Sequence, residues 1–277
     1  MNGLHNGLYN GLIEGLHPGL FDNEPNSGYD SDMIKFFEAG NFDGTHRRAT
    51  KYFISNCKKY GIWNKIIAYW PIMGGTAANH KLNMKDPRDT DSAFRLTFFG
   101  NLSHSPTGMK GVSGGYADTH VIPSANLLLN DCHLCFYART AGSLSSIEMG
   151  SAAAGGPYTL LQLKYTNSWF YGDVNQTTED GVLNPFPVRF HLATRTASNV
   201  KKLMIEGKVL LNGVAVSTGL NSRSMFLMCE NLNGTAAYFT VRECAGAGVG
   251  YGLTVTEAFI FSQIVKGTNT ILGRNVY

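Results

Sequence analysis

From Tyr69 onward, the sequence is divided into short runs of β-branched and aromatic residues, with glycines and other turn residues between them. The runs at 94–98 and 134–140 alternate between two sets of side chains, as the two faces of a strand require. Strand-like runs that recur about every 8–12 residues between turn signals indicate a sandwich or a barrel. We therefore predict a mostly β fold, a β-sandwich flanked by a few helices.

The strongest local signal lies at residues 203–216, LMIEGKVLLNGVAV. The pairs Glu206-Gly207 and Asn212-Gly213 separate three short apolar runs, and two-residue turns of this kind join antiparallel strands. This stretch predicts a three-stranded meander.

Three segments have helical character. We expect a short helix over 31–40 and a longer one over 49–67, where apolar residues approximate a 3.6-residue period. A third helix follows Thr254, because Thr254 and Glu257 fit a capping box. We expect it to break near Gly267 and to pack across one edge of the sandwich. Its expected buried stripe consists of Ala258, Phe261, Val265 and Leu272.

The first 20 residues repeat Gly-Leu every four positions. Burying one leucine stabilises a fold by about 1.5–3 kcal/mol, whereas ordering four backbone residues costs roughly 4–8 kcal/mol. The repeat should therefore gain order only against another surface, and we interpret it as an anchoring and assembly segment. A low-complexity leader without a partner is the alternative. The leucines that would make the contact are Leu4, Leu8, Leu12, Leu16 and Leu20.

These patterns divide the chain into three parts. Residues 1–30 are the anchoring and assembly segment, residues 31–68 a helical connector, and residues 69–277 the β-sandwich with its C-terminal helix. No apolar run approaches 18 residues, so we expect no membrane insertion. The first 30 residues also lack the pattern of a secretory signal.

Charge and cysteine content narrow the classes of partner and cofactor. The net charge is only +3 and no run of Lys and Arg exceeds two, so we expect no nucleic-acid partner. The five cysteines are an odd number and are expected to be free, mostly buried thiols. Cys132 and Cys135 have the spacing of a redox or zinc motif, but they lie in a strand-like run without a second pair. We predict no cofactor.

Asp86, Asp89 and Asp91 form the densest acidic cluster. Three carboxylates in six residues are weak candidates for a Ca²⁺ site, because Ca²⁺ takes 6–8 oxygen ligands. The commoner role is a turn in which aspartates cap backbone N–H groups and pair with Arg88, so we predict no metal. Four histidines lack the spacing of metal ligands and are interpreted as ordinary strand or loop residues: His104, His120, His133 and His191.

Trp169 and Tyr171 are candidate glycan-binding residues. Strand alternation places both on one face, with Phe170 on the other. Aromatic rings pack on the apolar faces of sugars. A strand with aromatic residues on both faces is, however, also typical of a strand with one face in the core and the other on a partly covered surface.

Two further stretches, FHLATRTASNVKKLMIEGKVLLNGVAVSTG and MFLMCENLNGTAAYFTVRECAGAGVGYGLTVTEAFIFSQIV, resemble the concanavalin A-like (laminin G-like) jelly roll. In that family, a strand ending in a basic or polar residue precedes a hairpin. The resemblance implies a jelly-roll β-sandwich here. The residues in corresponding places are Arg195, Asn199, Lys202, Gly207, Asn212 and Gly213.

Residues 30–277 also resemble a domain of structural proteins in tailed bacteriophages. The resemblance is carried by GGTAANHKLNMKDPRD and RECAGAGVG, together with the terminal ILGRN and the repeats of the leader. It implies a viral protein: a fibre, decoration or tail-appendage subunit of a virion, assembled in the cytoplasm of the host bacterium. Its partners would be other virion proteins, sister chains in a homotrimer, and host-surface glycans used for attachment.

Two alternatives to a virion structural protein remain, a soluble carbohydrate-binding lectin module and a glycosidase. Jelly-roll glucanases usually carry their carboxylates at i and i+4 on one strand, and no Glu-x-Asp-x-Glu occurs here. Glu206 lies in an expected turn and Glu257 in an expected cap. We therefore expect that the chain has no catalytic residues and is not an enzyme.

Overall fold

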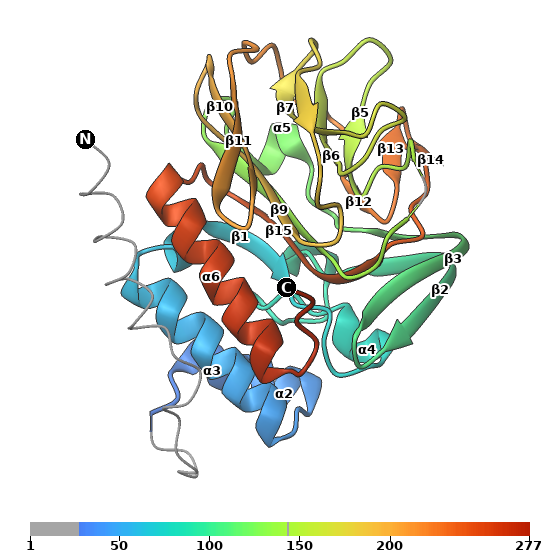
Figure 1. Ribbon diagram of the computed structural model, residues 1–277. Helices are drawn as coiled ribbons and strands as arrows, with labels where there is room; N and C mark the ends of the chain where they lie inside the picture. Colours follow the sequence, from blue (N-terminus) through green and yellow to red (C-terminus); the bar gives the residue numbers. More distant parts are fainter. Residues whose placement is uncertain (1–27, 143) are drawn as a thin grey trace.

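The computed structural model describes residues 28–142 and 144–277, so the five leucines of the repeat lie outside the described residues. The described part has three layers (Figure 1): a group of helices, a sheet face that they cover, and further strands stacked on the other side of that sheet. The predicted fold class, a mostly β jelly-roll-like sandwich with a few flanking helices, is confirmed.

The elements follow one another along the described chain with these bounds. The helices are α2 (Ser31–Gly40), α3 (Gly44–Lys59), η1 (Trp63–Lys65), α4 (Ala77–His80), η2 (Asp91–Ala93), α5 (Pro123–Asn126) and α6 (Val255–Ile271). The strands of the first half are β1 (Ile66–Trp70), β2 (Thr97–Ser105), β3 (Gly108–Asp118), β4 (Cys132–Ala138), β5 (Met149–Ala152), β6 (Tyr158–Gln162) and β7 (Trp169–Gln176). Those of the second half are β8 (Gly181–Leu183), β9 (Phe190–Ala197), β10 (Val200–Ile205), β11 (Lys208–Gly213), β12 (Phe226–Leu227), β13 (Glu230–Leu232), β14 (Thr235–Ala237) and β15 (Glu243–Gly250).

The described strands form one continuous hydrogen-bonded sheet in the order β11-β10-β9-β4-β15-β3-β12-β5-β6-β7-β8. In addition, β1 pairs with β15, β2 with β3, and β13 with both β5 and β14. The sheet folds over on itself, so that β6 and β7 pack against β4 although they are not hydrogen-bonded to it. Gly172 of β7 shows how closely these layers approach, because a Cβ there would lie 2.6 Å from both Ala193 Cβ and Leu203 Cδ2.

Strand β4 is buried along its whole length. Leu134 and Phe136 belong to a core between the two strand layers, whereas Cys135 and Tyr137 belong to a second core beneath the helices. The alternation predicted from the sequence is therefore present, but both faces of the strand lie in apolar surroundings. We refer to these as the inter-strand core and the helix-side core.

The helices α2, α3 and α6 cover the sheet and share the helix-side core with it (Figure 1). Tyr69 of β1 stacks on Phe53 of α3 at a ring distance of 4.5 Å and meets Phe261 of α6 edge-on at 5.9 Å. Asp30 caps α2 by accepting hydrogen bonds from two backbone N–H groups, and it forms an ion pair with Lys58 of α3 at 2.7 Å. The fold therefore includes Asp30. Among the described residues, none of the helices combines the length and apolar composition needed to cross a bilayer.

The predicted helix over 31–40 is confirmed as α2, whereas the helix predicted over 49–67 is wrong at both ends. It begins at Gly44, where Asp43 supplies the N-cap by accepting from the His46 backbone N–H. It ends at Lys59 because Gly61 adopts a left-handed backbone with φ of +74°, which breaks the helical path. Of the apolar residues that extend the helical period to 67, Trp63 belongs to η1, whereas Ile66 and Ile67 belong to β1.

The predicted meander over 203–216 is correct at its first turn only. Glu206 and Gly207 join β10 to β11, but β11 continues through Asn212 and Gly213, and no strand follows at 214–216. Gly213 permits close packing, since a Cβ there would lie 2.6 Å from Asp180 Oδ2. The third strand of the set is β9, on the other side of β10.

The C-terminal helix has the predicted capping box at Thr254 and Glu257, but it does not break near Gly267. A Cβ on Gly267 would lie 2.4 Å from the hydroxyl oxygen of Tyr52, so the glycine lets α6 lie directly on α3. The helix therefore covers a sheet face beside α3, where the sequence predicted an edge of the sandwich (Figure 1).

We expect Gly172→Ala to destabilise the protein by about 1–3 kcal/mol, because the added methyl group overpacks the contact of β7 with β9 and β10. Chemical denaturation of the wild type and the variant measures the change. Gly44→Ala is the matched control: a Cβ at Gly44 meets no atom within 4 Å, and alanine is the better helix former. Equal stability of the Gly172→Ala variant and the wild type would contradict the close packing of these layers.

Candidate functional site

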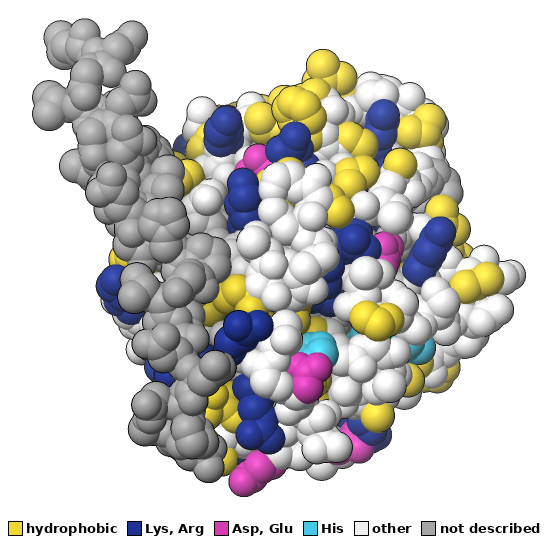
Figure 2. Space-filling view, turned by 60° about the horizontal axis from the view of Figure 1, so that its bottom comes forward, with side chains coloured by type: hydrophobic (Ala, Val, Ile, Leu, Met, Phe, Trp, Pro, Cys, Tyr) yellow, Lys and Arg dark blue, Asp and Glu magenta, His cyan; other side chains and the backbone are white. Residues whose placement is uncertain are grey.

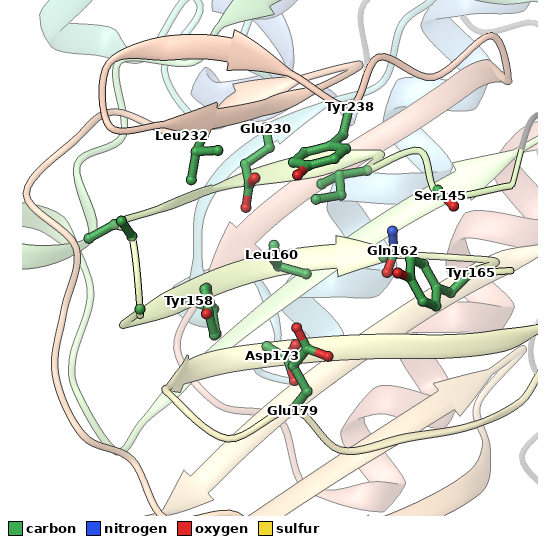
Figure 3. Close-up of a pocket in the computed structure, with 14 residues that line it drawn as sticks. Ser145, Tyr158, Leu160, Gln162, Tyr165, Asp173, Glu179, Glu230, Leu232 and Tyr238 are labelled. Carbon is green, nitrogen blue, oxygen red and sulfur yellow. The ribbon is translucent and has the colours of Figure 1, made fainter. Parts of the chain in front are cut away.

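A pocket of about 250 Å³ lies on the outer face of β5, β6, β7 and β13, the face that points away from the inter-strand core (Figure 3). Alternation along β7 explains why this face carries polar and aromatic groups. Phe170 and Val174 point into the core, so Tyr171 and Asp173 point outward.

A row of paired residues crosses the strands at the pocket. Glu230 of β13 pairs with Gly150 of β5, Gly150 with Leu160 of β6, and Leu160 with Asp173 of β7. Neighbouring strands lie about 4.8 Å apart, so three steps place the backbones of Glu230 and Asp173 roughly 14 Å apart. Gly150 contributes no side chain to the row, and a Cβ there would lie 2.4 Å from Leu160 Cβ, so the glycine lets β5 and β6 approach closely.

Tyrosines form the walls at both ends of the pocket (Figure 3). Tyr158 lies near one end and Tyr165 and Tyr238 near the other, and both Tyr165 and Tyr238 are exposed loop residues. Leu160 and Leu232 add apolar surface. The pocket therefore combines aromatic walls with acidic groups in a space large enough for a sugar residue.

The structure places the predicted pair Trp169 and Tyr171 beside this pocket. Their rings are 6.2 Å apart, and Tyr171 meets Tyr165 edge-on at 5.9 Å. Trp169 is 40 % exposed, and Asn167 Nδ2 donates a 2.9 Å hydrogen bond to the Tyr171 hydroxyl, which fixes that ring. Trp169, Tyr171 and Tyr165, which we call the aromatic row, lead along the surface into the pocket.

The two buried carboxylates of the pocket have different surroundings. Asp173 Oδ1 lies 3.6 Å from Nζ of the buried Lys201 and accepts a 2.8 Å hydrogen bond from Gln176. Burial nevertheless raises the pKa of Asp173 to about 7. Glu230 is only 3 % exposed, and no donor or cation in residues 28–142 and 144–277 pairs with its carboxylate. Burial, aided by the negative charge of Glu179, raises the pKa of Glu230 to about 7.

The acidic cluster singled out in the sequence lies elsewhere, near α4 and η2. Asp86 pairs with Arg88, while Asp89 pairs with both Lys81 and Arg95. Asp91 also pairs with Arg95, at 2.8 Å. In the part of the chain that the structure describes, no three His, Cys, Asp or Glu side chains are grouped so as to hold a metal ion.

The other candidate residues make contacts within the protein that stabilise the fold. All five cysteines are free and buried, as predicted, and Cys132 and Cys135 point into different cores. Glu206 forms an ion pair with Arg189. The histidines contact protein groups: His104 contacts His80, His120 contacts Thr97, His133 contacts the Tyr251 carbonyl, and His191 contacts Asn184. On the face shown in Figure 2, Lys and Arg side chains are spread among other groups.

Sequence reasoning missed Glu230, Asp173, Tyr165 and Tyr238. Their positions span more than 70 residues of sequence and no local spacing connects them. The pocket appears only when β13 pairs in parallel with β5, a pairing that brings residue 230 beside residue 150. The sequence did indicate one part of the site, the outward face of β7, through Trp169 and Tyr171.

Comparison with known proteins shows similarity in fold alone. No protein-family model and no curated protein sequence matches the chain. Among solved structures, it is similar to domain 4 of AbnA, a GH43 extracellular arabinanase from Geobacillus stearothermophilus, with a TM-score of 0.50 and 10% identity. That match covers 72% of this chain and 98% of the arabinanase domain. A mutant of Trypanosoma rangeli sialidase matches with a TM-score of 0.47 and 12% identity, covering 78% of this chain but 39% of the sialidase.

The similarity to the arabinanase domain corrects the expectation that the chain is not an enzyme. The fold occurs in a domain of a glycan-processing enzyme, so the fold class gives no reason to exclude catalysis. The missing Glu-x-Asp-x-Glu pattern gives none either, because Asp173 and Glu230 reach the pocket from different strands. A search for carboxylates on a single strand does not detect such a pair.

We expect Glu230→Gln to stabilise the protein by about 1–3 kcal/mol at pH 8. The folded-state pKa of about 7 lies above the ordinary value of 4.5, so the wild type loses stability as the pH rises through this window. Below about pH 4.5 the group is neutral in both states and the advantage of the variant should vanish.

Thermal unfolding of both proteins at pH 4, 6 and 8 measures this difference. Glu38→Gln, which removes the same charge from an exposed position on α2, is the matched control. Loss of stability in the Glu230→Gln variant at pH 8 would mean that the carboxylate has a stabilising partner.

Proposed function

We propose that this domain binds carbohydrate, with one sugar unit in the pocket and neighbouring units on the aromatic row. The observation that carries the proposal is that the aromatic row is continuous with the pocket. The rings of the exposed Trp169 and Tyr165, with the half-buried Tyr171 between them, form a series that ends at a pocket containing carboxylates.

The chemistry of both parts suits a glycan. Aromatic rings cover the apolar C–H faces of sugars, and carboxylates accept hydrogen bonds from their hydroxyl groups. The arabinanase domain that shares the fold was solved in complex with arabinotriose, which shows that one protein of this fold binds an oligosaccharide. At 10% identity, this comparison supports the class of ligand and no particular sugar.

We expect Trp169→Ala to weaken oligosaccharide binding by about tenfold, equivalent to about 1.4 kcal/mol, through loss of stacking surface. Tyr165→Ala should act in the same direction, because Tyr165 joins the row to the pocket. A glycan array identifies the ligand and calorimetric titration measures the affinity. Tyr251→Ala, which removes another partly exposed ring away from the pocket, is the control. Absence of binding to every glycan on the array would contradict the proposal.

We further propose that the domain is displayed on a bacteriophage virion, as a fibre, decoration or tail-appendage subunit held by the leucines of its repeat. The motivating observation is that each repeat offers one leucine to bury, which stabilises less than the ordering of its four backbone residues costs. Other virion proteins, or sister chains in a homotrimer, would supply the missing surface. Attachment to host-surface glycans would then be the role of the pocket.

We expect a chain that lacks residues 1–27 to fold with unchanged stability but to lose incorporation into particles. The truncation retains Asp30, because its side chain caps α2 and pairs with Lys58. Sedimentation and particle-assembly assays compare this chain with the full-length protein. Normal incorporation of the truncated protein would refute the anchoring role while leaving carbohydrate binding open to its own test.

A further inference from the structure

Glu230 is exceptional among the buried carboxylates of the described ranges. Glu148 is paired with Arg242 at 2.9 Å, Glu243 with Arg139 at 2.7 Å, and Asp173 lies 3.6 Å from the Lys201 ammonium. Glu230 is buried to a similar degree, yet no cation or hydrogen-bond donor within residues 28–142 and 144–277 reaches it. A buried charge without a partner is strongly unfavourable, so this group is poised for a partner from outside the chain.

The Glu230 side chain points toward the space that a ligand would fill. Figure 3 shows its side chain extending from β13 into the pocket, with Asp173 and Glu179 at the opposite side. The pocket lining contains these three acidic residues and no Lys, Arg or His among the described residues. Lys201 offsets the charge of Asp173 from behind the lining, so Glu230 and Glu179 leave the pocket with an excess of negative charge that favours cations and opposes anions.

We infer that the pocket selects a sugar unit carrying a protonated amine, with the ammonium group donating hydrogen bonds to the Glu230 carboxylate. This inference rests on the proposed carbohydrate-binding function and specifies its ligand class. An ammonium supplies the three N–H donors that the unpaired carboxylate lacks. The sugar ring lies against Leu160, Tyr158 and Leu232, and Asp173 and Glu179 add attraction from the other side.

Two other classes of ligand fit the pocket less well. A metal ion needs several oxygen ligands around one point, and no such group of three exists in the described ranges. Sialic acids and uronic acids carry carboxylates, which three acidic side chains would repel.

The test compares a glucosamine trisaccharide with the N-acetylglucosamine trisaccharide of the same linkage, by calorimetric titration at pH 7. The two ligands share their rings and linkage, and N-acetylation replaces the protonated amine by a neutral amide. We expect the wild type to bind the amine form at least tenfold more tightly. Glu230→Gln should remove that preference, so that the two trisaccharides bind the variant with similar affinities. Glu38→Gln, which removes one exposed charge outside the pocket, should retain the preference.

Each outcome decides between the two proposals. Equal or tighter binding of the acetylated trisaccharide by the wild type would overturn the amine inference and leave carbohydrate binding intact. A preference that survives in the Glu230→Gln variant would also overturn the inference, because general acidity would then explain it. Failure of both trisaccharides would overturn the amine inference, and failure of every sugar on a glycan array would overturn the proposed function as well.

Discussion

The double burial of β4 is the constraint on which the rest of the structure depends. A strand with apolar surroundings on both faces must be covered on both, and its side chains divide strictly between two cores. Leu134 and Phe136 require strands stacked on one side, whereas Cys135 and Tyr137 require the helices on the other. The three layers of the molecule follow from this requirement.

The position of the pocket is a further result of the same arrangement. Because the strands stacked on β4 use one face for the inter-strand core, their other face is left to the surface. On β7 this face carries Trp169, Tyr171 and Asp173, while Phe170 and Val174 hold the strand in place. The residues of the site are thus positioned by strands whose inward side chains are closely packed, which favours a preformed pocket.

The sequence predicted those parts of the structure that depend on neighbouring residues. The alternation of β4, the cap at Thr254 and the outward pair on β7 all follow from local spacing. Glycines were the main source of error. The sequence predicted a turn at Gly213 and a helix break at Gly267, but both glycines instead allow distant segments to pack closely together. Glu230 was missed for a related reason: only the parallel pairing of β13 with β5 brings it to the pocket.

The separation of the two cores also has an evolutionary consequence. Pocket walls at Tyr165, Glu179 and Tyr238 belong to loops on the outer side of the second strand layer, whereas the helices rest on the opposite side of β4. Substitutions at these loop positions leave both cores intact, because none of the three side chains is part of either. The rim of the pocket can therefore change in sequence while the helices and the central strand persist as an unchanged frame.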